Sequence, residues 1–198
     1  VVASIRSVVD AAPASVRAHD GRRIAVWALP EDRFLVAPSV RDVLRAVEGE
    51  LIKGDPQLLA REVLSVVMAG MSMVNVLPRL QESAILVVAA DRTEVLLAAL
   101  LANASGTFPS LSGIVLNGGF SLPEPIDRLI DGLGSSLPII TTDFGTYDTA
   151  VRIMSARGRV DADSQRRYDS ALAMFEQHVD VAELTVALGL ARSHVVTP

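Results

Sequence analysis

The sequence contains no cysteine, which excludes disulfide bonds, thiolate catalysis and cysteine-ligated metals. Aromatic residues make up only 4% of the chain, and the three histidines, His19, His178 and His194, lie far apart. We expect these histidines to be solvated or locally hydrogen-bonded, so we predict no metal site. The G-x-S-x-G, G-x-x-x-x-G-K-[ST] and H-E-x-x-H motifs are also missing, and no residue is predicted to be catalytic.

The chain also has no excess of positive charge and no long apolar run. The chain has 18 basic against 23 acidic residues, a net charge of −5, which argues against binding to nucleic acid or to an anionic membrane. The longest apolar run, Val95–Ala102, is far shorter than the roughly 18 residues of a membrane span. With no recognisable signal peptide, the chain is expected to be cytoplasmic.

Hydrophobic residues are nevertheless abundant, at 50% of the chain, with a mean hydropathy of +0.39. Such an excess indicates either a large core or apolar surface that packs against another domain or subunit, and self-association is therefore expected. The chain begins at Val1 without methionine and stops at Pro198. We interpret it as a piece of a longer polypeptide.

Apolar strand-like runs alternate with helical stretches along the middle of the chain. The expected strands are Glu62–Gly70, Ala84–Ala90, Gly113–Gly119 and Leu137–Thr142. The expected helices are Met73–Leu80, Thr93–Asn103, Glu124–Leu133 and Thr146–Ala156. The strands lack polar alternation, as in sheets that are buried on both faces. We therefore predict an α/β fold with three layers, in which helices cover both faces of a parallel or mostly parallel sheet.

The two flanks differ from this pattern. A helix is expected from Ser39, with Val40, Val43, Leu44 and Val47 on one face. The run Leu51–Pro56 contains Gly-Asp-Pro, which is turn chemistry and indicates a boundary. At the other end, Asp161–Leu190 is predicted to form one or two helices that act as a connector.

Four loops follow the predicted strands and should meet at the carboxyl edge of the sheet, where open parallel sheets bind ligands. Their glycines, hydroxyls and one guanidinium suit a small anion. The candidate ligand-binding residues are Arg92, Thr93, Asn117, Gly118, Gly119, Thr142 and Thr146.

Each of these loops also has a purely structural interpretation. Asp91 and Glu94 have the spacing of a capping box before an apolar helix, and Asp143 can cap the helix after the last strand. Asn117-Gly118-Gly119 can be a turn that needs positive φ angles. Only the convergence of the loops favours a ligand over caps and turns.

The middle of the chain resembles the DRTGG domain, the non-catalytic middle domain of long-form phosphate acetyltransferases. Asp91-Arg92-Thr93 matches the first three letters of the motif that names the family, while Glu94-Val95 replaces its two glycines. Asn117-Gly118-Gly119 and Thr146-Tyr147-Asp148-Thr149 resemble the family's glycine turn and its helix-opening threonines. This resemblance implies three segments: 1–52 as the end of an ATPase-like domain similar to dethiobiotin synthetase, 53–158 as the DRTGG domain, and 159–198 as a helical connector to a catalytic domain.

The resemblance also implies a function. A parent phosphate acetyltransferase would interconvert acetyl-CoA and phosphate with acetyl phosphate and coenzyme A. This chain would be its inactive regulatory and oligomerisation portion, with no cofactor of its own. Its implied partners are a second copy, the adjacent catalytic domain and a small-metabolite effector. The alternative is a free-standing module that senses a nucleotide or a small organic acid.

Overall fold

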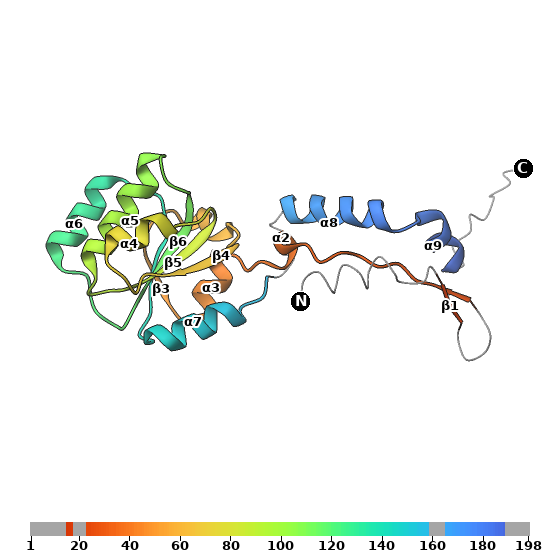
Figure 1. The fold of residues 1–198 in the computed structure, drawn as a ribbon, viewed down its shortest axis with the longest axis horizontal. Coiled ribbons are helices and arrows are strands. Elements are labelled where there is room, and N and C mark those ends of the chain that lie inside the picture. The colour runs from red at the N-terminus through yellow and green to blue at the C-terminus, as the bar shows by residue number, and fades with distance from the viewer. Residues whose placement is uncertain (1–14, 18–22, 159–164, 189–198) are drawn as a thin grey trace, which may run out of the picture. The chain divides into compact units, whose positions relative to one another are not determined.

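The computed structural model describes residues 15–17, 23–158 and 165–188 (Figure 1). It divides into two compact units, residues 1–35 with 164–198, and residues 36–163. In the first unit, β1 (Ser15–Arg17) and β2 (Arg23–Ala25) pair antiparallel. The same unit contains α8 (Gln165–His178) and α9 (Val181–Ala187), in agreement with the prediction of one or two helices there. The short α2 (Arg33–Val36) spans the residues where the second unit begins.

The second unit is built on a five-stranded sheet in the order β3-β7-β6-β5-β4. Strands β4 to β7 are mutually parallel, and β3 pairs antiparallel with β7 at one edge. The strands are β3 (Glu50–Lys53), β4 (Ser65–Met68), β5 (Ala84–Ala89), β6 (Leu111–Asn117) and β7 (Ile139–Thr141). The four predicted strands are thus confirmed, and the sheet is mostly parallel.

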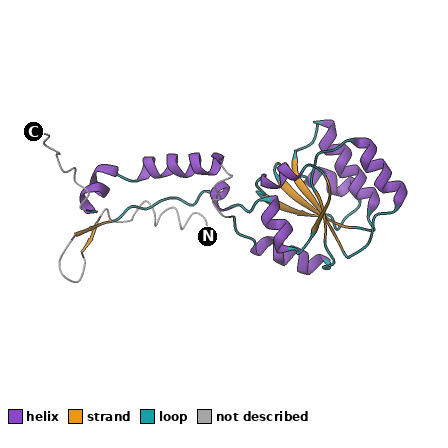
Figure 2. Ribbon diagram, turned by 180° about the vertical axis from the view of Figure 1, so that it is seen from behind, coloured by secondary structure: helices purple, strands orange, loops and turns teal. Residues whose placement is uncertain are grey.

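Helices cover both faces of this sheet, as predicted (Figure 2). One face carries α4 (Met73–Val76), α5 (Thr93–Ser105) and α6 (Glu124–Leu133). The other carries α3 (Val40–Ala46) and α7 (Thr146–Ser155). Two 3₁₀ turns, η1 (Pro56–Ala60) and η2 (Leu77–Arg79), complete the unit. The three-layer α/β architecture follows directly from strands that are apolar on both sides.

Alternate residues of one strand enter two different cores, which explains the missing polar alternation. In β5, Leu86 packs with α5, whereas Ile85 packs with α3 and α7, and both are fully buried. Every residue of β6, the central strand, is buried. A strand inside such a sheet has no solvent face, so its sequence reads as one continuous apolar run.

The compact unit begins earlier than the sequence indicated. Residues 1–52 were assigned to a preceding domain, but α3 and β3 lie within the unit that starts at residue 36. The Gly54-Asp55-Pro56 turn is real and marks only the end of β3, because Gly54 adopts φ +96° and Asp55 caps η1. The identity of the remaining residues before Val36 as part of an ATPase-like domain stays a prediction, and residues 1–14 and 18–22 lie outside the described part of the chain.

Candidate functional site

Four strand-to-helix loops lie at one edge of the sheet because β4, β5, β6 and β7 run in the same direction. Strand β3 runs the opposite way, so the turn before it, at Glu48 and Gly49, joins the same edge. The predicted convergence of loops is therefore present. A fifth segment, which the sequence did not assign to this domain, contributes to the edge as well.

The loops after β6 and β7 are bonded to each other. The buried Asn117 donates a side-chain hydrogen bond to the Thr146 hydroxyl at 2.9 Å. The Gly118 amide donates to the carbonyl of Phe144, and the Gly119 amide donates to that of Thr142. Gly118 and Gly119 have φ angles of +97° and +72°, as the turn interpretation predicted. The structure thus brings five of the candidate ligand-binding residues together, and most of their polar groups bond within these loops or to Val47, whereas the buried Oδ1 of Asn117 has no hydrogen-bond partner.

Arg92 and Thr93 lie elsewhere on the edge, at the end of β5. The Arg92 guanidinium donates to Glu94 at 2.6 Å and to the carbonyl of Met71 at 3.0 Å. This ion pair lowers the pKa of the Glu94 carboxyl below its ordinary value, because the hydrogen bond from Arg92 stabilises the charged form. Arg92 therefore ties the β4 loop to the β5 loop. Neither Arg92 nor Thr93 lines the cavity described below.

The capping roles assigned to Asp91, Glu94 and Asp143 are not observed. The residue at the N-cap of α5 is Arg92, so Asp91 lies one position too early. The Glu94 carboxyl bonds the Arg92 side chain and its own backbone amide, and not the amide of the N-cap residue. The N-cap of α7 is Gly145, two residues beyond Asp143. Neither helix has a side-chain capping bond.

A complete capping box occurs at α3 instead. The Ser39 hydroxyl accepts from the Asp42 amide, and the Ser39 amide donates to the Asp42 carboxylate. Capping needs the acceptor exactly at the helix boundary, and a shift of one residue is enough to lose it.

A cavity of about 630 Å³ opens where the loops after β6 and β7 separate. They separate because the helices that follow them, α6 and α7, cover opposite faces of the sheet. Divergence of two neighbouring loops is the arrangement that creates a ligand crevice in open α/β sheets. The cavity is lined by Glu48, Glu50, Ile52, Lys53, Gly119, Phe120, Ser121, Leu122, Asp127, Thr141, Thr142 and Asp143.

Carboxylates outnumber cations in this cavity, with Glu48, Glu50, Asp127 and Asp143 against the single Lys53. The Lys53 ammonium is already held by Asp131 at 2.6 Å and by Asp127 at 2.9 Å. These hydrogen bonds, that from Asp131 first, raise the pKa of Lys53 above its ordinary value. The expected small anion is therefore not favoured here, because the one guanidinium of the four loops, Arg92, lies outside the cavity.

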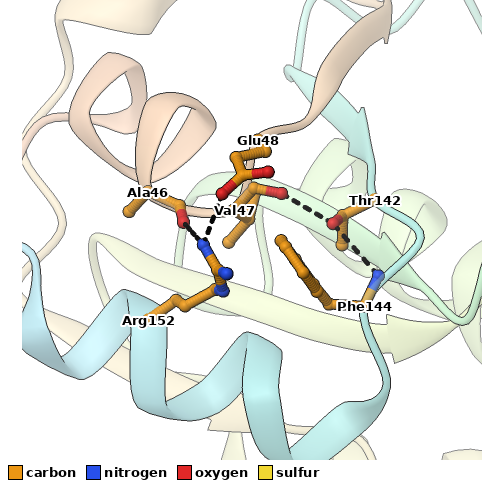
Figure 3. A network of polar contacts seen from close by, with 6 residues as sticks. All are labelled: Ala46, Val47, Glu48, Thr142, Phe144 and Arg152. Atoms are coloured by element: carbon orange, nitrogen blue, oxygen red, sulfur yellow. Dashed lines mark hydrogen bonds and ion pairs between the residues drawn. The ribbon is translucent and has the colours of Figure 1, made fainter.

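The wall formed by the end of α3 is fixed by a network of polar contacts (Figure 3). Arg152, from α7, donates to the Ala46 carbonyl at 3.2 Å and pairs with Glu48 at 2.8 Å. Its guanidinium carbon lies 3.7 Å from the centre of the Phe144 ring. Glu48 adopts φ +47° at the position after a helix where glycine is common, and its ion pair with Arg152 helps to hold it there.

Thr142, the residue that follows β7, contributes the second half of the same network. The buried Thr142 hydroxyl donates to the Val47 carbonyl at 2.7 Å and accepts from the Phe144 amide at 3.4 Å. Thr142 thus connects the end of β7 to the end of α3 through a hydrogen bond, and it also lines the cavity. Sequence reasoning missed Glu48, Lys53 and Arg152 because their partners are distant in the chain. Arg152 is 104 residues from Glu48 and 106 from Ala46, which both lie in the segment assigned to another domain. Lys53 is 78 residues from Asp131.

Fold and site together define an α/β domain with a mostly parallel sheet and an acidic cavity at its carboxyl edge. The family model of the DRTGG domain matches residues 42–156, and the chain therefore belongs to the DRTGG domain family. The resemblance seen in the sequence is confirmed. The matched range begins within α3, in agreement with the structural boundary.

Curated relatives of this chain include several phosphate acetyltransferases. That of Nitratidesulfovibrio vulgaris is 30% identical over 176 residues, which are 88% of this chain and 25% of the relative. That of Synechocystis sp. is 26% identical over 91% of this chain and 26% of the relative. The chain thus spans about a quarter of the length of these relatives.

Among solved structures, a similarity is found to the CBS and DRTGG domains of the regulatory region of Clostridium perfringens pyrophosphatase, a structure complexed with the activator diadenosine tetraphosphate. The TM-score is 0.44 at 15% identity, and the match covers 78% of this chain and 69% of the other. Within the described residues of the present chain, no helix has the length and apolar character needed to cross a membrane.

Proposed function

We propose that this chain is the regulatory and assembly portion of a phosphate acetyltransferase, and that acetyl transfer takes place outside it. The observation that carries the proposal is the extent of the similarity, which covers 88% of this chain but only 25% of the N. vulgaris relative. A parent of this kind interconverts acetyl-CoA and phosphate with acetyl phosphate and coenzyme A. The remaining three quarters of such a relative hold ample chain for the catalytic machinery.

The chemistry of the sheet edge supports this division of labour. The side-chain amide group of Asn117 donates to Thr146, Arg92 donates to Glu94 and Met71, and the Thr142 hydroxyl donates to Val47. Residues engaged in this way hold loops in place and are not poised to transfer protons. Across the described ranges, no cluster of histidine, cysteine and acidic side chains is arranged to hold a metal ion.

The proposal is tested by assaying the purified chain for acetyl transfer between acetyl phosphate and coenzyme A. We expect no turnover above a buffer blank, whereas a full-length phosphate acetyltransferase in the same assay gives a robust signal. Addition of the chain to a coupled assay with that enzyme controls for inhibitors in the preparation. Turnover by the chain alone, abolished by boiling, would contradict the proposal.

A sensing role within the same proposal is favoured by the cavity at the ends of β6 and β7. Its volume of about 630 Å³ lies within the range of roughly 300–1,000 Å³ that is common for small-molecule sites. Its position is the one at which open parallel sheets bind ligands. We therefore propose that a small metabolite binds there and regulates the parent enzyme.

Thermal unfolding measures this binding directly, because a ligand that binds only the native state stabilises it by about 2.7 kcal/mol at 100 times its Kd. We expect a shift with at least one of the neutral polyols and amines in a panel that also contains nucleotides and organic acids. The response should disappear in Glu50→Gln, which changes the cavity, and persist in Asp91→Asn, an exposed acid at the same edge. Loss in Arg92→Ala instead would place the ligand at the β4 and β5 loops. A flat response to the whole panel would remove the sensing role.

A further inference from the structure

Helix α7 has apolar side chains on two opposite faces. Its inner face contributes Thr149 and Ile153, which are 0% and 2% exposed. Its outer face carries Tyr147, Val151 and Met154, which are 79%, 44% and 70% exposed. The spacings of four and three residues place these three side chains in one line along the helix. We call this line the α7 stripe.

The outer face of a helix that packs on a sheet is ordinarily polar. Here three large, exposed apolar groups lie on a helix of 10 residues, and their spacing makes them neighbours along one face. Contiguous apolar surface of this kind is typical of a protein contact. The α7 stripe therefore accounts for part of the high hydrophobic content of the sequence.

We propose that the α7 stripe is the contact between two copies of this chain, with the two α7 helices antiparallel about a two-fold axis near Val151. This inference rests on the assembly role proposed above and assigns a surface to it. A two-fold contact requires a surface that is complementary to itself. In the antiparallel arrangement Val151 faces its own counterpart, and Tyr147 faces Met154 of the second copy, a favourable sulfur–aromatic pair.

Charge supports a second copy as the occupant. Asp148 is exposed in the first turn of α7, and Arg157 is exposed just beyond its last turn. The Arg157 guanidinium donates to the Met154 carbonyl at 3.1 Å, which holds it beside the stripe. Antiparallel pairing brings the acidic end of each helix to the basic end of the other and also opposes the helix dipoles. Parallel pairing would instead place like charges together.

The size of the stripe predicts a weak dimer. Three side chains on one helix bury much less than the roughly 800 Å² per partner of a standard interface. We therefore expect association of the isolated chain only at high micromolar concentration. In a longer parent chain, further contacts would add to it.

Sedimentation equilibrium of the whole chain, from low micromolar to near-millimolar concentration, tests the surface. We expect a monomer–dimer equilibrium that Met154→Glu weakens by at least about tenfold, the effect of losing roughly 1.4 kcal/mol. Leu129→Glu is the matched control, because Leu129 is 55% exposed on α6, which covers the opposite face of the sheet. It should leave the equilibrium unchanged. Far-UV circular dichroism verifies that both variants are folded.

A charge exchange tests the antiparallel arrangement. Asp148→Lys and Arg157→Glu should each weaken the dimer, because each creates like-charged pairs. An equimolar mixture of the two variants should restore it, since the heterodimer has two opposite-charged pairs. Failure of the mixture to associate better than either variant would overturn the arrangement.

The possible failures are distinguishable. A dimer that Met154→Glu leaves intact would overturn the α7 assignment while the proposed assembly role stands. A wild-type chain that remains monomeric over the whole range would overturn both the surface and the assembly role. Neither result bears on the acetyl-transfer assay or on ligand binding at the cavity.

Discussion

Gly49→Ala is expected to lower the free energy of unfolding by about 1–3 kcal/mol. A Cβ atom at Gly49 would lie 2.6 Å from the carbonyl oxygen of Thr141 and 2.7 Å from Cγ2 of Ile140. Both atoms belong to β7, and the carbonyl oxygen is part of a backbone that the sheet holds in place. The substitution therefore forces β3 away from β7, at the wall of the cavity that Glu48 and Thr142 share.

Urea unfolding followed by far-UV circular dichroism measures this loss. Gly132→Ala is the control, because a Cβ atom there meets nothing within 4 Å and Gly132 lies inside helix α6. Alanine is the better helix former, so this control should stabilise the domain by about 0.5–1 kcal/mol. If Gly49→Ala behaved like Gly132→Ala, the close contact between β3 and β7 would be refuted.

Thr142→Val is expected to cost about 1–3 kcal/mol, the usual range for a buried polar group left without its partner. Valine has nearly the shape of threonine, so the main change is the loss of the hydroxyl that donates to Val47 at 2.7 Å. The Val47 carbonyl then stays buried between α3 and β7 without that bond. The effect should appear in the same urea titration with an unchanged m-value.

Thr141→Val provides the matched control one residue earlier. Thr141 is half-buried in β7 and also lines the cavity, but its hydroxyl makes no comparable tie to α3 among the described contacts. Valine suits a strand at least as well as threonine, so we expect a change within about 0.5 kcal/mol. Equal losses in the two variants would show that the Thr142 hydroxyl does not tie α3 to the sheet.

The helices and strands of the sheet domain could be predicted because their signals are local. The run Ala84–Ala89 is apolar at every position, and the helix that follows begins at Thr93 as expected. Strand β3 gave no such signal. It is an edge strand that pairs with β7 on one side only, and its register is irregular between Leu51 and Lys53. Because an edge strand is partly exposed, it can contain charged residues such as Glu50 and Lys53. These residues interrupt the apolar pattern from which a strand would be predicted.

The candidate site was predicted only in part, for a related reason. The Gly118-Gly119 turn and its position at the sheet edge follow from local backbone requirements and from strand direction. Arg92 was selected for its charge, yet its guanidinium is used within its own loops by Glu94 and Met71. Which donor meets which acceptor depends on side-chain directions that the strand pattern does not contain.

The sequence by itself determined the alternation of strands and helices, the parallel arrangement of the four strands from β4 to β7, the edge at which the loops meet and the membership of the DRTGG family. These properties follow from local periodicity, from the handedness of crossovers and from short motifs. Only the tertiary structure decided that β3 forms one edge of the sheet, that the cavity is acidic and that α7 exposes an apolar stripe. These depend on pairs such as Glu48 with Arg152, which are 104 residues apart and become neighbours only through folding.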